Sequence, residues 1–161
     1  MAQACCDEVL LLAGDRRFEL TDVRAVPDLP GVAGPLAGLA AGLEAARHDW
    51  CLLLSCDQPF VNREHVTWLK RRLNEAHTQP LAVVFEDDHG LQPFCGLYHR
   101  DLLPALSRNL AEGDRSLRGL LSSCPLLPVP LSDLPDELAA ACLFDVDTPA
   151  DLARARELSP S

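Results

Sequence analysis

The sequence predicts an α/β protein, a three-layer α/β/α sandwich built around a mainly parallel sheet. Short runs rich in Val and Leu alternate with longer helix-like segments along the chain, which is typical of this architecture. The chain has 161 residues, of which 48% are hydrophobic and 24% are charged. This size and composition suit one globular core. We therefore expect residues 1–161 to form a single domain.

The strands are predicted from short apolar runs that end at turn residues. The third run, Trp50–Ser55, is apolar almost throughout, which predicts a central parallel strand covered on both faces. The turn Asp87-Asp88-His89-Gly90 between the fourth and fifth runs predicts a β-hairpin. In chain order, we expect strands over 8–13, 23–26, 50–55, 81–86, 91–98 and 126–129, and a short extended piece at 144–147.

The helices are predicted from their starting residues and from apolar periodicity. Pro35 suits the first turn of a helix that continues with many Ala and Leu residues. Asn62 can cap the next helix, in which apolar residues recur on one face. Thr148-Pro149 opens the last one. In chain order, we expect helices over 36–47, from Asn62 to about 76, and over 101–110, 116–121 and 148–157.

Charge and cysteine content exclude several classes of protein. The net charge of −10 argues against binding to nucleic acid or to an anionic membrane surface. No apolar run approaches the length of a membrane span, and the N-terminus does not resemble a secretory signal, so we expect a cytoplasmic protein. Seven cysteines without a C-x-x-C pair argue against a disulfide framework and a zinc site. The five histidines show no ligand spacing and are predicted to lie at the surface or in turns.

Three carboxylates are candidate metal ligands. Ligands of such sheets sit beyond the carboxyl ends of the strands, and Asp57 follows the most apolar run. There it can bind Mg²⁺, or merely cap the turn before the Asn62 helix. Asp145 and Asp147 are two residues apart in an extended segment, so their side chains share one face. One of them can complete a metal site with Asp57, while Asp147 or Thr148 can instead cap the last helix.

A glycine series and a few cations are candidates for binding anions. Gly31 and Gly34 precede a helix N-terminus, whose free N–H groups favour phosphate. Gly38 and Gly42 mark one face of that helix, and for Gly42 we expect close packing rather than ligand contact. Arg115 and Arg118 can face a phosphate or simply lie in solvent.

Taken in order, six segments resemble the molybdenum cofactor guanylyltransferases, the MobA-like nucleotidyltransferases. The resemblance runs from about Asp7 to Glu157, and the segments Gly34-Pro35-Leu36-Ala37-Gly38 and Cys56-Asp57-Gln58-Pro59-Phe60 are the most specific. The others are Asp28, Gln92-Pro93, Gly113-Asp114-Arg115-Ser116-Leu117 and the stretch from Phe144 to Leu152. The resemblance implies a Rossmann-like nucleotidyltransferase sheet.

The resemblance also implies an activity and a site. The family joins GMP from GTP to molybdopterin and releases pyrophosphate, and Asp57 matches its catalytic Mg²⁺-binding aspartate. Asp145 and Asp147 match positions that are often Asn in the guanylyltransferases, and Asp there is closer to the cytidylyltransferase branch. The implied metal ligands are therefore Asp57, Asp145 and Asp147. The implied nucleotide and substrate contacts are Asp28, Gly34, Pro35, Gly38, Gln92, Pro93 and Arg115.

One family feature is missing from the sequence. The family opens with a glycine-rich loop of the form L-A-G-G-x-S-x-R-M-G, and this chain has nothing like it. We therefore expect the domain to be N-terminally truncated relative to the family. Two alternatives to a guanylyltransferase follow. One is a non-catalytic relative that binds a nucleotide, molybdopterin or a molybdoenzyme maturation protein, and the other is a cytidylyltransferase or sugar-phosphate nucleotidyltransferase.

Overall fold

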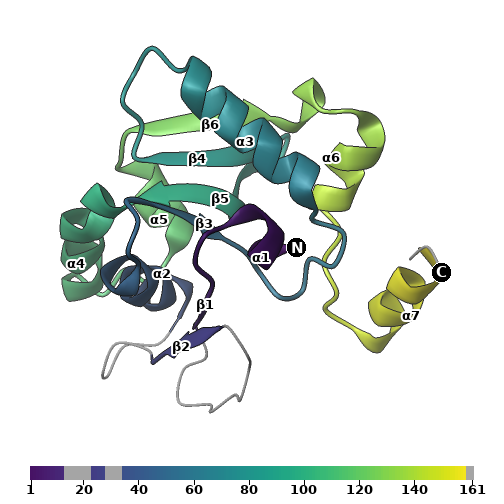
Figure 1. The fold of residues 1–161 in the computed structure, drawn as a ribbon, viewed down its shortest axis with the longest axis horizontal. Coiled ribbons are helices and arrows are strands. Elements are labelled where there is room, and N and C mark those ends of the chain that lie inside the picture. The colour runs from purple at the N-terminus through teal and green to yellow at the C-terminus, as the bar shows by residue number, and fades with distance from the viewer. Residues whose placement is uncertain (13–22, 28–33, 159–161) are drawn as a thin grey trace.

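The computed structural model describes residues 1–12, 23–27 and 34–158, so the candidates Asp28 and Gly31 lie outside the described residues. Six strands form two sheets in this part of the chain (Figure 1). The small sheet pairs β1 (Leu10–Leu12) with β2 (Arg24–Val26) in parallel. The main sheet has the order β3 (Trp50–Leu53), β5 (Gly90–His99), β4 (Ala82–Asp87) and β6 (Leu126–Pro130). Its strands β3, β4 and β6 point the same way and β5 runs against them.

Helices cover both faces of the main sheet, which confirms the three-layer arrangement (Figure 1). One face carries α2 (Pro35–Ala45), α4 (Leu103–Ala111) and α5 (Leu117–Ser122). The other face carries α3 (Arg63–Glu75) and α6 (Asp136–Cys142). The short α1 (Ala2–Cys5) contacts α3, and α7 (Pro149–Leu158) follows α6 at the C-terminal side. Single 3₁₀ turns occupy Arg100–Leu102 and Leu131–Asp133.

Strand β4 lies at the centre of the core. Its residues Ala82 and Val84 pack in the cluster under α2, α4 and α5, while Val83 and Phe85 pack in the cluster under α3 and α6. All four side chains are fully buried, and each large one stabilises the fold by about 1.5–3 kcal/mol. None of the described helices is long and apolar enough to cross a bilayer.

The prediction for Trp50–Ser55 is half confirmed. Both faces of β3 are covered, because Cys51 and Leu53 contact one apolar cluster and Trp50 and Leu52 contact the other. The prediction that this strand is central and has a parallel neighbour is wrong for the described sheet, where β3 is an edge strand. The predicted hairpin is the reason, since its second strand, β5, inserts between β3 and β4 and pairs with both in antiparallel fashion.

A large β-bulge interrupts the hairpin next to Gln92. Phe85 pairs with Gln92 and Val83 pairs with Leu97, so a single residue of β4 lies opposite the whole segment 93–96 of β5. Within the bulge, Cys95 has a φ of 54°. Bulges of this kind bend a strand and re-aim its side chains, often beside a functional site.

His65 is buried, and the prediction that it lies at the surface is wrong. Its Nδ1 accepts a hydrogen bond from the Asn62 backbone N–H at 3.1 Å, as part of a capping box at the start of α3. Its Nε2 donates to the Leu138 carbonyl oxygen of α6 at 2.9 Å. Both ring nitrogens are therefore used by a neutral imidazole that joins the two helices. Burial lowers the pKa of His65, because the charged form is poorly solvated there.

Stability is expected to fall as the pH drops below about 6.5, the ordinary pKa of histidine. Because the native pKa of His65 is lowered, the unfolded chain takes up the proton first. The free energy of unfolding then falls by up to about 1.4 kcal/mol per pH unit until the native pKa is reached. Urea unfolding at a series of pH values measures this slope.

His65→Gln is expected to remove the slope, whereas the exposed His77→Gln is expected to keep it. Hydrogen bonds also lower the pKa values of Glu8, Asp87 and Asp151, but carboxylates add pH dependence only below about pH 4.5. An unchanged slope in His65→Gln would show that another group carries the effect.

Candidate functional site

Most of the described candidate residues lie at one edge of the main sheet. Strands β3, β4 and β6 end at this edge, and Asp57 follows the end of β3. The antiparallel β5 starts at the same edge, which places Gln92 and Pro93 there. Strand β5 ends at the opposite edge, and helix α4 leads the chain back from there. Arg115, which follows α4, therefore also lies at the edge of Asp57. Ligands of α/β sheets bind at such an edge.

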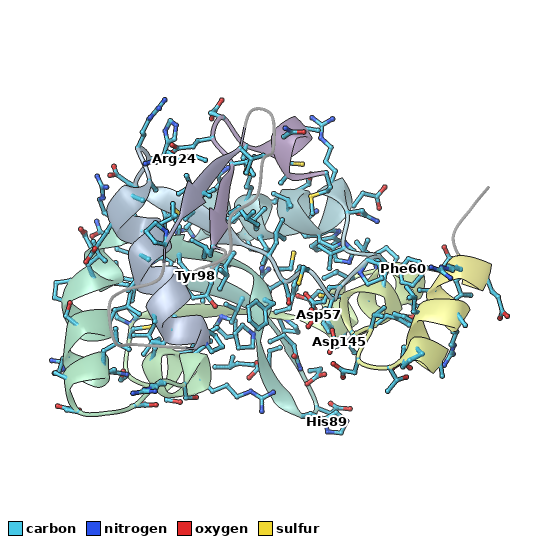
Figure 2. The ribbon with its side chains drawn as sticks, turned by 90° about the horizontal axis from the view of Figure 1, so that it is seen from below. Arg24, Asp57, Phe60, His89, Tyr98 and Asp145 are labelled. Carbon is cyan, nitrogen blue, oxygen red and sulfur yellow. The ribbon has the colours of Figure 1, made fainter. Side chains whose placement is uncertain are left out.

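A main-chain hydrogen bond joins the two acidic segments. The backbone N–H of Val146 donates to the Asp57 carbonyl oxygen at 2.9 Å. Asp145, the residue before Val146, therefore lies beside Asp57, and Figure 2 shows the two side by side. Two acidic residues 88 positions apart in the sequence are thus neighbours in space.

Two further contacts hold the same segments together. The rings of Phe60 and Phe144 meet edge to face, with centroids 5.0 Å apart and an interplanar angle of 73°. The Gln58 side-chain amide donates to the Cys142 carbonyl oxygen at 3.4 Å. Together with the hydrogen bond at Asp57 itself, these contacts of Gln58 and Phe60 fix the turn against the segment 142–147.

The capping role considered for Asp57 falls to Asn62, and of the two candidates Asp147 and Thr148 it is Thr148 that caps the last helix. Asn62 caps α3, since its Oδ1 accepts a hydrogen bond from the Glu64 N–H at 2.8 Å. At α7, the Thr148 Oγ1 accepts from the Asp151 N–H at 3.2 Å, and the Asp151 carboxylate accepts from the Thr148 N–H at 2.9 Å. Within the described part of the chain, the carboxylates of Asp57, Asp145 and Asp147 have no hydrogen bond or ion pair. All three therefore remain open to a ligand.

The donor atoms at this edge suit a hard cation. No group of three or more His, Cys, Asp or Glu side chains among the described residues could enclose a metal ion by itself. Mg²⁺ does not require such a cage, because it is usually held by one or two carboxylates together with water and substrate phosphates. The nearby Cys142 thiol is not a competing ligand. Burial, with smaller effects from Asp145 and Asp87, raises the pKa of Cys142 to about 12 and keeps it protonated.

Gly34 and Arg115 lie next to each other. Gly34 precedes α2 with a φ of 117°, a left-handed conformation that favours glycine. A Cβ atom added at Gly34 would lie 3.9 Å from the Arg115 Cβ. The exposed Arg115 side chain thus leaves the backbone beside the N-terminus of an 11-residue helix, where backbone N–H groups attract anions. Pro35 at the first helical position offers no N–H of its own.

Gly38 and Gly42 face β1. The atom nearest to an added Cβ is a Leu12 side-chain carbon in both cases, at 3.7 Å from Gly38 and 3.4 Å from Gly42. This contact agrees with the packing role expected for Gly42. It gives Gly38 the same neighbour.

The Gln92 side chain is oriented by Asp87. Its Nε2 donates to the Asp87 Oδ2 at 3.1 Å, and Asp87 also accepts from the His89 N–H at 2.8 Å. Although desolvation opposes it, this hydrogen bonding lowers the pKa of Asp87 and keeps the carboxylate ionised. An ionised carboxylate can only accept, so the Gln92 amide nitrogen is committed to Asp87 and the amide oxygen remains for a ligand.

Two of the cavities among the described residues are lined by charged side chains. The one at the carboxyl ends of β4 and β6 has a volume of about 390 Å³ and is lined by Asp87, Pro130 and Asp136 among others. The other, of about 570 Å³, lies near the start of β1 and is lined by Glu8, Arg24 and Arg47 among others. There Glu8 binds Arg24 at 2.9 Å and the Arg47 N–H at 3.0 Å. That carboxylate is already neutralised. Asp57, Asp145 and Arg115 line neither of these two cavities.

Comparison with known proteins points to one family. Residues 1–128 match the family described as the MobA-like NTP transferase domain. The molybdenum cofactor guanylyltransferase of Vibrio cholerae is 34% identical over 133 residues, which cover 83% of this chain and 62% of that protein.

Two solved structures share the fold. The Archaeoglobus fulgidus molybdopterin-guanine dinucleotide biosynthesis protein A has a TM-score of 0.71 at 26% identity, over 84% of this chain and 67% of that one. Rv0371c of Mycobacterium tuberculosis, solved in complex with manganese, has a TM-score of 0.55 at 23% identity, over 96% of this chain and 81% of that one. The chain thus spans about two thirds of the length of the Vibrio cholerae and Archaeoglobus fulgidus proteins.

Proposed function

Since the chain belongs to the MobA-like NTP transferase domain family, we propose that it transfers GMP from GTP to molybdopterin and releases pyrophosphate. The observation that supports this proposal is the hydrogen bond from the Val146 N–H to the Asp57 carbonyl oxygen, which brings the segment of Asp145 to the Asp57 turn. We propose Mg²⁺ as the cofactor, with Asp57 as its principal ligand and Asp145 or Asp147 as the second.

In the proposed reaction, a terminal phosphate oxygen of molybdopterin attacks the α-phosphorus of GTP. A new P–O bond forms in line with the bond to the leaving pyrophosphate, which breaks. The bound cation supplies neutralisation of the charge on the transferring phosphate. This chain's own contribution is to hold the carboxylates together and to position the nucleotide.

The electrostatics of the chain fit this division of roles. A net charge of −10 repels two anionic substrates, so local positive charge is needed at the site. We assign Arg115 and the α2 N-terminus beside Gly34 and Pro35 to the nucleotide phosphates. Asp28 and Gly38 are proposed as further nucleotide contacts from the family resemblance alone. We assign Gln92, with Pro93 beside it in the bulge, to an N–H donor of the base or the pterin, because its amide oxygen is free.

Cytidylyl transfer is the second candidate, and the residues at 145 and 147 favour it. Both residues are Asp. In this respect the chain is closer to the cytidylyltransferase branch than to the guanylyltransferases, which often have Asn at these positions. The proposed catalytic carboxylates serve either nucleotide, so the choice of base depends on other contacts.

A nucleotide panel tests the proposal. The protein is incubated with molybdopterin, Mg²⁺ and GTP, CTP or UTP in turn, and pyrophosphate release is measured. We expect release with GTP that stops when the cation is chelated. Release with CTP alone would favour the second candidate. Binding of nucleotide by calorimetry without any release would instead favour a non-catalytic relative.

A further inference from the structure

Gln58 has a buried side-chain oxygen with no partner. Among the side chains that the structure describes, its Oε1 is the single buried nitrogen or oxygen atom without a hydrogen bond. A buried acceptor left unpaired costs about 1–3 kcal/mol, so native proteins rarely leave one without a donor or a bound ion. This oxygen belongs to the residue directly after Asp57.

The orientation of the Gln58 amide is fixed by α6. Its Nε2 donates to the carbonyl oxygen of Cys142, the last residue of α6. Because a carbonyl oxygen only accepts, the amide nitrogen must face Cys142 and the oxygen must face elsewhere. The Asp145 carboxylate lies close enough to Cys142 to influence its thiol. The Gln58 amide therefore lies between the Asp57 turn and the segment that carries Asp145.

We propose that Gln58 Oε1 is a further ligand of the cation held by Asp57 and Asp145. This inference rests on the proposed function of the site. Amide oxygens are accepted ligands of hard divalent cations, which surround themselves with six or more oxygens. A neutral third oxygen adds a ligand without adding charge repulsion to the carboxylate pair.

Two substitutions separate an oxygen ligand from a structural bridge. Gln58→Glu keeps an oxygen but loses the N–H that Cys142 accepts, and Gln58→Leu loses both. Binding of Mn²⁺ alone to the full chain is measured by calorimetry, with thermal unfolding in the absence of metal as the control for folding. We expect Gln58→Leu to weaken Mn²⁺ binding about tenfold, in the range found for groups that support a metal site. Gln58→Glu is expected to bind at least as tightly as the unsubstituted protein.

The other outcomes overturn the inference. Equal weakening in both variants would mean that Gln58 acts only through its hydrogen bond to Cys142. Unchanged binding in both would mean that a water molecule satisfies the oxygen. If Asp57→Asn abolishes Mn²⁺ binding while Gln58→Leu leaves it intact, the proposed function stands and the role of Gln58 fails. If the unsubstituted protein binds no Mn²⁺, both fail.

Discussion

Asp57→Asn is expected to lower the rate of nucleotidyl transfer by about 10²–10³-fold or more, the usual loss when a preorganised electrostatic group is removed from an active site. The substitution keeps the size of the side chain and removes its charge. Since the Asp57 carboxylate has no partner within the described residues, its loss should change the free energy of unfolding by no more than about 0.5 kcal/mol. Pyrophosphate release and urea unfolding measure the two quantities.

Asp88→Asn is the matched control for this substitution. Asp88 lies exposed in the hairpin turn and carries the same charge, so its removal changes the net charge equally. We expect the control to keep its rate and its Mn²⁺ affinity. An Asp57→Asn protein that is destabilised as strongly as it is inactivated would point to a structural role for the carboxylate instead.

Gly96→Ala is expected to destabilise the protein by about 3 kcal/mol, at the upper end of the usual cost of overpacking a core. A Cβ atom at this position would lie 2.9 Å from the Pro93 carbonyl oxygen, from Tyr98 Cε2 and from Val84 Cγ1. The Pro93 oxygen cannot move away freely, because the Tyr98 hydroxyl donates to it at 2.6 Å. Urea unfolding gives the loss as a lower midpoint.

Gly38→Ala provides the contrast within the same chain. The nearest atom to its added Cβ is Leu12 Cδ1 at 3.7 Å, an ordinary contact, and the position lies inside a helix. Alanine is favoured over glycine there by about 0.5–1 kcal/mol, so this variant should be as stable as the parent or more so. Equal stability of Gly96→Ala and the parent would show that the bulge can widen at little cost.

The sequence was sufficient to predict features that depend on local chemistry. Proline at the start of α2, asparagine at the start of α3 and the glycine-containing turn of the hairpin each act on their neighbours in the chain. The structure has helices and a hairpin at these places. Asp57 could be placed at the end of a strand for the same reason, since an apolar run followed by a turn is a local pattern.

Features that depend on distant partners were not predictable. His65 is buried because the Leu138 carbonyl of α6 accepts its ring N–H, and α6 itself was missed. The start Pro135-Asp136-Glu137 followed by Leu138 and Cys142 on one face was the available signal for that helix. The edge position of β3 depends on where the hairpin inserts, which no residue of β3 encodes.

At the candidate site, too, local features could be predicted and features that depend on distant partners could not. Asp145 and Asp147 are both exposed, and that they share one face stays a prediction. The family resemblance is confirmed by the match over residues 1–128. The orphaned oxygen of Gln58 and the orientation of Gln92 by Asp87 could only be seen once side chains far apart in the chain were placed together.

The late position of Val146 in the chain has a consequence for synthesis on the ribosome. All four strands of the main sheet precede it, so the sheet can assemble before the segment that pairs with Asp57 has left the exit tunnel. When β6 has emerged, the chain holds all four strands, while α6 has still to complete the apolar cluster on its face of the sheet. The proposed cation site, which needs both the Asp57 turn and the Asp145 segment, would therefore form only after the strands are in place.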